Sequence, residues 1–188
     1  MFRLDGKTCA ITGAATGIGF EMARLFSKSG AKCVFLLDID EKSAKEAASK
    51  ITGRAIALRC DVTSASSVRE CFNKMMQMSD RIDILCNNAG IGHVGSIKGT
   101  LVLITFTFLT LNVPNSDADA TETDLDRVVK VNINGVFNCA KEAIRVMTSD
   151  GKGGVILNTG SCASVHPIKD RVVYAATKGA VLTMTTSL

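Results

Sequence analysis

The hydrophobic pattern divides the chain into short continuous apolar runs and longer segments with a helical period. Continuous apolar runs predict strands buried in a sheet, and they occupy residues 8–11, 32–37, 54–60, 82–86 and 154–159. Apolar residues that recur every three or four positions predict helices, which begin near residue 17 and cover residues 41–51, 66–78, 121–148 and 171–188. Strands that alternate with such helices predict an α/β fold with a doubly wound, mostly parallel sheet of the Rossmann type.

One long interval interrupts this alternation. Residues 91–120 separate the fourth strand from the next helix, although loops longer than roughly 12–15 residues are uncommon in compact domains. Within it, residues 101–113 are uncharged and rich in β-branched and aromatic side chains. This composition is typical of a strand, and the run is too short for the ~20 residues of a membrane-spanning helix. We expect one domain over residues 1–188, an atypical insert at about 99–119, and no membrane partner.

Composition and charge exclude several other classes of protein. The 22 basic and 18 acidic residues give a net charge of +4 with no block of like charges, which does not favour a nucleic-acid partner. The seven cysteines form no CxxC pair and lie mostly in apolar runs, as buried thiols of a reducing compartment do. Residues 1–7 carry charges where a signal peptide has its apolar region, so we expect a cytoplasmic protein. Two histidines without ligand spacing predict no metal site.

A glycine-rich turn, TGAATGIG at residues 12–19, links the first strand to the first helix. Gly13 would let the chain reverse tightly, Gly17 would let backbone N–H groups approach a pyrophosphate, and Gly19 would let the helix pack close to the strand. The helix N-terminus would then face the phosphates. The spacing GxxxGxG departs from the GxGxxG of the usual fingerprint, and a glycine turn can also be a simple connection.

An acidic residue, Asp38, ends the second strand nineteen residues after Gly19. This spacing suits a carboxylate that accepts hydrogen bonds from the adenosine ribose hydroxyls. A carboxylate there would repel the 2′-phosphate of NADP, so Asp38 favours NAD. The alternative is that Asp38 only caps the helix at 41–51, a role that Asp40 could also fill. Polar residues also follow the third and fourth strands, at the sheet edge where such folds bind ligands.

Two residues in the final helix form a candidate acid–base pair. Tyr174, the only tyrosine of the chain, and Lys178 are four positions apart and therefore share one helix face. A tyrosine that transfers protons near neutral pH needs a cation to stabilise its phenolate form. An ammonium group at ~4 Å supplies about 4 kcal/mol at an effective dielectric constant of ~20. Alone, the pair could equally be a packed tyrosine beside an exposed lysine.

Taken together, the motifs resemble the short-chain dehydrogenase/reductase family in order and spacing. The resemblance covers residues 4–188 apart from the insert. It rests on TGAATGIG, Asp38, the pair Asp61 and Val62, NNAG at 87–90, VNING around Asn132, Ser161, and YAATK at 174–178.

The resemblance implies a hydride transfer between NAD(H) and a small alcohol or ketone. Tyr174 would be the general acid–base, Lys178 would hold the nicotinamide ribose and stabilise the tyrosinate, and Ser161 would hydrogen-bond the substrate oxygen. Asn132 would anchor a water molecule of the proton relay. NAD is the implied cofactor, with NADP the less favoured choice. The implied cofactor contacts are Gly13, Thr16, Gly17, Ile18, Gly19, Asp38, Asp61, Val62, Asn88, Ala89, Gly90, Tyr174 and Lys178.

The chain departs from the family pattern in two respects. The insert lengthens a connection that is short in the family, and family chains continue with further strands and form dimers or tetramers. We therefore expect a C-terminally truncated Rossmann-type domain with little activity of its own. Residues 155–157 are continuously apolar, as in a strand covered on both faces, yet the strand would form an open sheet edge. The alternative function is an inactive truncated or alternatively spliced product that at most binds nucleotide.

Overall fold

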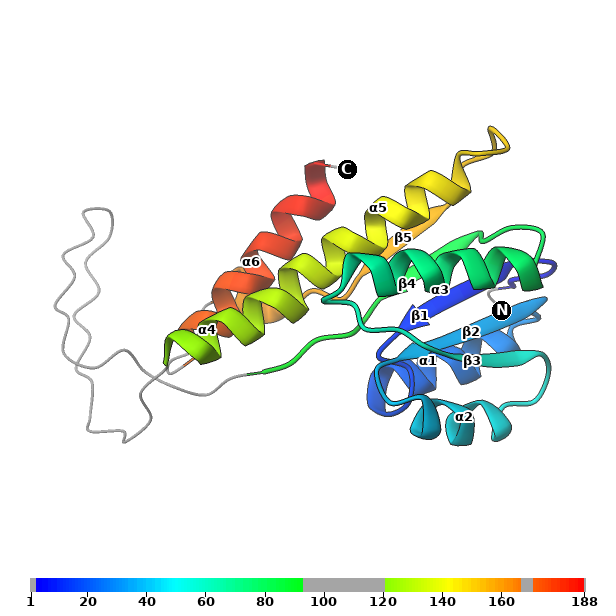
Figure 1. Ribbon diagram of the computed structural model, residues 1–188, viewed down its shortest axis with the longest axis horizontal. Coiled ribbons are helices and arrows are strands. Elements are labelled where there is room, and N and C mark those ends of the chain that lie inside the picture. The colour runs from blue at the N-terminus through cyan, green and yellow to red at the C-terminus, as the bar shows by residue number, and fades with distance from the viewer. Residues whose placement is uncertain (1–2, 93–120, 167–170, 188) are drawn as a thin grey trace, which may run out of the picture.

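A parallel sheet forms the centre of the molecule (Figure 1). The computed structural model describes residues 3–92, 121–166 and 171–187. Within these residues, five strands pair in the order β3-β2-β1-β4-β5, and every pairing is parallel. The strands are β1 (Thr8–Thr12), β2 (Cys33–Asp38), β3 (Ala55–Arg59), β4 (Ile84–Asn87) and β5 (Val155–Asn158). This order, which runs outward in both directions from β1, confirms the doubly wound α/β fold.

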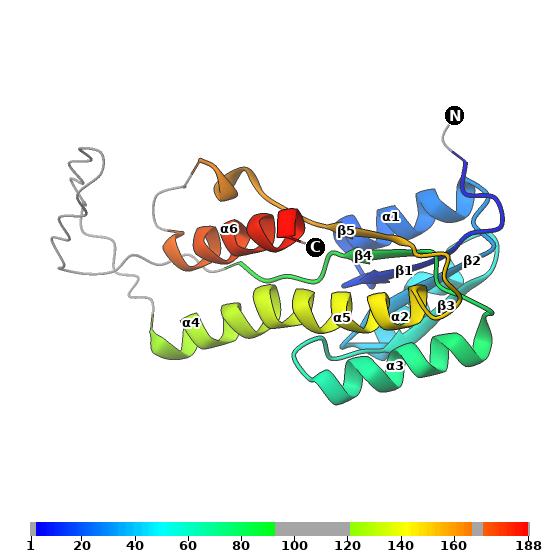
Figure 2. The same cartoon turned by 90° about the horizontal axis from the view of Figure 1, so that it is seen from above.

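Helices connect successive strands and cover both faces of the sheet. Helices α1 and α2 lie on one face, and α3 and α5 lie on the other (Figures 1 and 2). A π-helical turn, η1, joins α4 to α5, and a short 3-10 turn, η2, precedes α6. The bounds are α1 (Gly17–Lys28), α2 (Glu41–Ser49), α3 (Ala65–Met78), α4 (Glu122–Val129), η1 (Lys130–Asn134), α5 (Gly135–Met147), η2 (Cys162–Ser164) and α6 (Val172–Ser187).

The predicted elements match the observed ones to within a few residues, with one interruption. The segment 121–148, predicted as a continuous helix, is divided by η1, where the hydrogen-bond ladder widens to the π pattern at Lys130–Asn134. The predicted insert at 99–119 and the β-prone run at 101–113 lie outside the described residues.

Two apolar clusters hold the helices against the sheet. Side chains of one strand point alternately to opposite faces, so Phe35 and Leu37 of β2 pack with α3 and α5, whereas Leu36 packs with α1 and α2. Phe72 of α3 is fully buried in the first cluster, and Ala23 of α1 is fully buried in the second. Burial on both faces is the physical reason why β2 is a continuous apolar run.

Strand β5 forms one edge of the sheet, as expected, but it is covered on only one face. Ile156 packs against the cluster beneath α5, while Val155 and Leu157 are 51% and 46% exposed on the opposite face. The prediction that both faces are covered is therefore wrong for the described residues. Helices α1 and α2 pack on β1, β2 and β3. Helix α6 contacts the carboxyl end of β5, where the side-chain amide of Asn158 donates to the Thr185 hydroxyl at 3.0 Å. Val155 and Leu157 nevertheless stay exposed.

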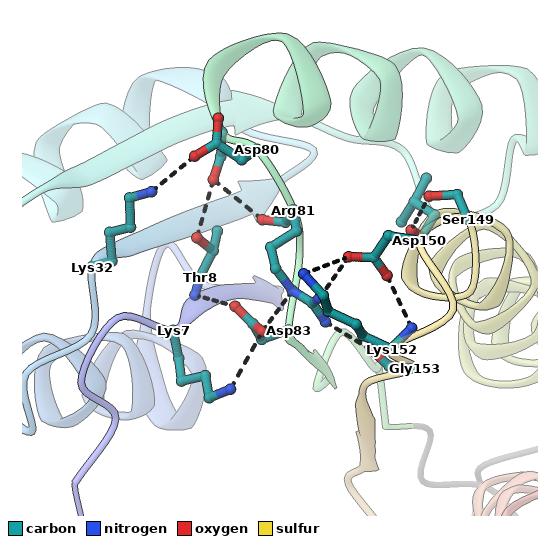
Figure 3. A network of polar contacts seen from close by, with 12 residues as sticks. Lys7, Thr8, Lys32, Asp80, Arg81, Asp83, Ser149, Asp150, Lys152 and Gly153 are labelled. Atoms are coloured by element: carbon teal, nitrogen blue, oxygen red, sulfur yellow. Dashed lines mark hydrogen bonds and ion pairs between the residues drawn. The ribbon is translucent and has the colours of Figure 1, made fainter.

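A polar network ties together the amino ends of three strands (Figure 3). The carboxylate of buried Asp83, just before β4, accepts a hydrogen bond of 2.8 Å from the Thr8 amide of β1. It also pairs with Arg81 at 2.7 Å. Arg81 in turn donates to Asp150 at 2.7 Å and to the main-chain oxygen of Gly153, before β5, at 2.8 Å. Ion pairs thus link the amino ends of these strands, and the candidate site lies at the carboxyl ends of the strands.

Candidate functional site

The glycine-rich turn follows β1 and has the tight geometry that the sequence predicts. Gly13 and Gly17 have φ angles of +63° and +57°, which residues with a Cβ rarely adopt. A Cβ on Gly13 would lie 2.9 Å from the Cα of Ala89. A Cβ on Gly19 would press against the main-chain oxygen of Gly13 and lie 3.0 Å from the Cα of Ala14. The turn therefore needs glycine both for its backbone angles and for its packing against α1.

The N-terminus of α1 differs from those of three other described helices. Its N-cap residue, Thr16, makes no side-chain hydrogen bond to the first turn. By contrast, Asp40 caps α2, Ser64 caps α3, and Thr121 caps α4 through a reciprocal capping box. Because no side chain caps the first-turn N–H groups of α1, these groups and the positive end of the helix dipole suit a phosphate.

Asp38 lies at the carboxyl end of β2, beside the glycine turn. Its carboxylate accepts hydrogen bonds from the amide of Ala15 at 3.0 Å and from the amide of Asp40 at 3.2 Å. The side chain of Asp40, rather than that of Asp38, caps α2 by accepting from the amides of Lys42 and Ser43. The carboxylate of Asp38 is consequently available to a ligand as well as to the turn.

The turn after β4 is fixed directly to the glycine turn. The side-chain amide of Asn88 donates to the main-chain oxygens of Thr12 and Gly13, at 3.1 and 3.2 Å. The backbone amides of Asn88 and Ala89 both donate to the hydroxyl of Thr12 at 3.0 Å. Asn88 therefore supports the glycine turn. The hydroxyl of Thr12, a residue that the sequence analysis missed, accepts from both backbone amides.

A cavity of about 860 Å³ runs along this carboxyl edge of the sheet. Its lining brings together most of the residues that the resemblance implied for the cofactor. These are Gly13, Thr16, Ile18, Asp38, Asp61, Val62, Asn88, Ala89 and Gly90. Gly17 lines a neighbouring hollow on α1, and Gly19 is buried behind the turn.

The sequence analysis missed several residues that line the same cavity. They are Ile39, Cys60, Thr63, Ile91, Gly92, Arg127 and Val131. Ile91 and Gly92 directly follow the NNAG motif, and Arg127 and Val131 are four positions apart on the helix that leads to Asn132. Proximity to a motif and a shared helix face were the available signals.

Lys178 connects helix α6 to the end of this cavity. Its side chain is almost buried, at 6% exposure, and its Nζ donates to the main-chain oxygen of Thr159 at 2.6 Å. Nζ lies 5.9 Å from the centroid of the half-buried Tyr174 ring, so the two residues share a helix face as predicted. A Cβ on Gly90 would lie 3.7 Å from Nζ of Lys178 and 3.3 Å from Oδ1 of Asn132. Lys178 and Asn132 thus converge on one residue of the cavity wall.

Ser161 begins the turn η2, which packs on α6. Its hydroxyl accepts a 3.1 Å hydrogen bond from the amide of Ala163 and caps the turn. Ser164, in the same turn, donates to the main-chain oxygen of Lys178 at 3.0 Å. The turn that carries Ser161 is therefore attached to the helix that carries Tyr174 and Lys178. Both Ser161 and Tyr174 are half-buried and accessible to a small ligand.

These features fit a dinucleotide. The cradle at Gly13 and Gly19 leaves no room for a side chain, the N-terminus of α1 offers uncapped amides, and Asp38 offers a carboxylate beside the turn. A family model described as "short chain dehydrogenase" matches residues 7–188. The chain belongs to the short-chain dehydrogenase family. This membership confirms the resemblance drawn from the motifs.

Individual relatives extend this result. The chain is 35% identical over 179 residues to "Tropinone reductase-like 1" of Erythroxylum coca, with 95% of this chain and 59% of the relative covered. It is 34% identical over 185 residues to "Sorbitol dehydrogenase" of Cereibacter sphaeroides, with 98% and 64% covered. The chain thus spans about three fifths of the length of the curated relatives that it matches.

Solved structures share the fold of this chain. One is the 3-ketoacyl-(acyl-carrier-protein) reductase from Brucella melitensis complexed with NADH, with a TM-score of 0.82 and 32% identity. The match covers 98% of this chain and 69% of that chain. A short chain dehydrogenase from Mycobacterium smegmatis has a TM-score of 0.83 and 29% identity, with 98% and 72% covered.

Within residues 3–92, 121–166 and 171–187, no three His, Cys, Asp or Glu side chains are grouped so that they could hold a metal ion. No helix in the same ranges combines the length and the apolar character that crossing a bilayer requires. His166 is exposed beside η2, and His93 lies outside the described residues.

Burial gives Lys178 a pH-dependent effect on stability. Desolvation lowers the pKa of its ammonium group below the ordinary value of 10.5. The folded chain therefore releases this proton at a lower pH than the unfolded chain does. Below the folded-state pKa, the folded chain bears the full cost of burying the charge. As the pH rises from that pKa towards 10.5, the unfolded chain binds more protons than the folded chain, so the free energy of unfolding increases.

We expect Lys178→Met to remove this pH-dependent contribution. The difference in free energy of unfolding, wild type minus variant, should increase as the pH rises towards 10.5. Urea unfolding at several pH values, followed by circular dichroism, measures it. Lys152→Met, which replaces an exposed lysine just before β5, at the amino ends of the strands, is the control. Its difference in free energy of unfolding should change less with pH. If the difference in free energy of unfolding for Lys178→Met stays constant or falls with pH, burial does not lower the pKa of Lys178.

Proposed function

We propose that this protein is an NAD-dependent oxidoreductase that transfers a hydride between NAD(H) and a secondary alcohol or ketone. The observation that carries the proposal is the convergence of Lys178 and Asn132 on Gly90, which lines the cavity that also contains Asp38 and the glycine turn. The candidate proton-transfer groups and the nucleotide cleft therefore adjoin. The family match favours this function over an inactive product that at most binds nucleotide.

The mechanism uses four side chains of this chain. Ser161 hydrogen-bonds the substrate oxygen and orients it towards Tyr174, whose hydroxyl exchanges a proton with that oxygen. Lys178 would hold a ribose hydroxyl of the cofactor, and its positive charge stabilises the tyrosinate. When bound, the nicotinamide supplies the hydride-transfer chemistry. The names of the tropinone reductase-like and sorbitol dehydrogenase relatives support an alcohol or ketone substrate.

Asn132 takes the fourth role, as the anchor of a relay water. Its Oδ1 accepts from the amide of Ile91 at 2.9 Å, and its Nδ2 donates to the Ile91 oxygen at 3.0 Å and to the Thr177 hydroxyl at 3.1 Å. Both amide hydrogens are therefore used by protein atoms. A relay water must donate its hydrogen bond to an oxygen atom of Asn132, which makes Asn132 an acceptor in the relay.

Asp38 should make the protein prefer NADH to NADPH. A like-charged 2′-phosphate beside a carboxylate costs several kcal/mol, so we expect a preference of at least about tenfold in affinity. Asp38→Ala should narrow the difference, because it removes the repulsion. Titration of both cofactors by their fluorescence measures it.

Asp40→Ala provides a matched control for this prediction. It removes the cap of α2 two positions away, so it should lower stability by about 1 kcal/mol without changing the cofactor preference. Tighter binding of NADPH than of NADH by the wild-type chain would refute the role of Asp38.

Turnover is tested with the 188-residue chain and a panel of secondary alcohols and ketones, by following the absorbance of NADH. Turnover that requires both NAD⁺ and a secondary alcohol supports the function. A chain that binds NADH but turns over no member of the panel supports the alternative. A chain that binds no NADH contradicts both.

We also propose a homo-oligomer and a reducing, cytoplasmic compartment. Phe137 and Ile144, seven positions apart on α5, are 58% and 41% exposed, and this supports contact with a second copy. The compartment is proposed from the seven free thiols, six of which are buried. Light scattering after size-exclusion chromatography tests the oligomer, since a monomer at all concentrations contradicts it.

A further inference from the structure

A buried threonine, Thr177, lies between the two candidate catalytic segments. It is 1% exposed, and its position on α6 is adjacent to Lys178. Its hydroxyl donates to the main-chain oxygen of Tyr174 at 2.8 Å and contacts the side-chain amide of Asn132 at 3.1 Å. In both views, α6 runs alongside the rod formed by α4, η1 and α5 (Figures 1 and 2), and α6 contacts α4 and η1.

The direction of each hydrogen bond follows from the chemistry of the groups. A hydroxyl has one hydrogen, and that of Thr177 goes to the Tyr174 oxygen, so towards Asn132 it can only accept. The amide nitrogen of Asn132 must therefore face Thr177. The oxygen of the same side chain, Oδ1, then faces the main-chain N–H of Ile91. Thr177 and Ile91 thus favour the same orientation of the Asn132 side chain, and through Asn132 they link α6 to the cavity wall.

The orientation of Asn132 determines the position of one wall of the cavity. Asn132 bonds both the amide and the carbonyl of Ile91, at 2.9 and 3.0 Å, and Ile91 lines the cavity. If the side-chain amide of Asn132 rotated by half a turn, its N–H group would face the main-chain N–H of Ile91. Its carbonyl oxygen would then face the main-chain oxygen of Ile91. Both contacts would then be repulsive, and a buried polar group would lose its partner.

We propose that Thr177 is a positioning residue that acts through Asn132 and aligns the Tyr174–Lys178 helix with the Ile91 wall of the cofactor cavity. The proposal rests on the function proposed above. It assigns to Thr177 no contact with substrate or cofactor.

The competing explanation is a purely structural threonine. Threonines within helices often bond a preceding carbonyl, and Thr183 of the same helix does so with Gly179 at 3.2 Å. Thr183 is exposed, so it provides a matched control that lacks the bond to Asn132. A structural role predicts that Thr177→Val lowers thermal stability but leaves the turnover of the folded molecules unchanged.

The test compares Thr177→Val, Thr177→Ser and Thr183→Val in the 188-residue chain. The valine at 177 keeps the shape but cannot accept from Asn132, whereas serine keeps the hydroxyl. We expect Thr177→Val to lower kcat by up to about 10²-fold, the effect of a misplacement of ~1 Å, with a smaller change in the KM of the alcohol. Thr177→Ser and Thr183→Val should stay close to the wild type.

A second measurement does not depend on turnover. Hydrogen exchange of the Ile91 amide, which is protected by its bond to Asn132, should accelerate in Thr177→Val and not in the other two variants. Equal protection in all three variants overturns the proposal, whether or not the chain is active. Faster exchange with unchanged kcat also overturns it. Failure of the wild type to bind NADH refutes the proposed function instead, and the exchange result then decides whether Thr177 positions Asn132.

Discussion

Tyr174→Phe should remove nearly all turnover while leaving the affinity for NADH almost unchanged. The substitution deletes the phenol hydroxyl, and Tyr174 is the only tyrosine in the chain. It keeps the ring that lies 5.9 Å from Nζ of Lys178, so the packing of α6 is retained. General acid–base catalysis contributes about 10²–10⁴-fold, and we expect a loss of that size in kcat. Steady-state kinetics with the most active alcohol and NADH titration by fluorescence measure the two quantities.

His166→Gln is the control for this prediction. His166 follows Ser161 by five positions and is exposed at the end of η2, and an imidazole is a common acid–base group in enzymes. Its replacement should leave kcat within a small factor of the wild type. A Tyr174→Phe variant that keeps a substantial fraction of the rate, or a His166→Gln variant that loses the rate, would assign the acid–base role to another group.

Gly19→Ala should lower both the affinity for NADH and the stability of the fold. The added methyl group would meet main-chain atoms of Gly13 and Ala14 and the side-chain nitrogen of Asn88 at 2.6 Å. Main-chain atoms cannot move aside as a flexible side chain can, so the glycine turn must shift. Overpacking typically costs about 1–3 kcal/mol in stability, and displacement of the turn should weaken NADH binding by about tenfold or more.

Gly179→Ala is the matched control for Gly19→Ala. Gly179 also lies within a helix, but a Cβ there has no atom within 4 Å outside its own helix. Alanine at that position should be neutral or stabilise the chain by about 0.5–1 kcal/mol, because glycine is a poor helix former. Urea unfolding and NADH titration compare the two variants. The packing argument is wrong if Gly19→Ala behaves like Gly179→Ala in both measurements.

The elements of the fold were predictable because their signals are local. The run at 32–37 is apolar on both faces, as β2 is buried on both faces. The same reasoning failed for 155–157, where β5 has the same apolar pattern but is covered on one face only. Apolar sequence shows that a strand can be buried on both sides, whereas the packing of the other elements decides whether it is.

Some residues of the cavity lining were also predictable from sequence. Each lies at a fixed distance from the end of a strand, and the carboxyl ends of parallel strands meet at one edge of the sheet. This topology brought Asp38, Asp61 and Gly90 to the same cavity. The sequence offered two carboxylates, Asp38 and Asp40, as the N-cap of α2. Only the structure assigned that cap to Asp40.

The strand and helix pattern, the family, and the shared face of Tyr174 and Lys178 could thus be inferred from local sequence signals. Tertiary structure alone decided that Asn132 bonds Ile91, 41 positions earlier, and Thr177, 45 positions later. It also decided that Lys178 donates to the main-chain oxygen of Thr159. Hydrogen bonds between such distant residues leave no periodic trace in a single sequence, because they depend on how close the packed elements bring their side chains.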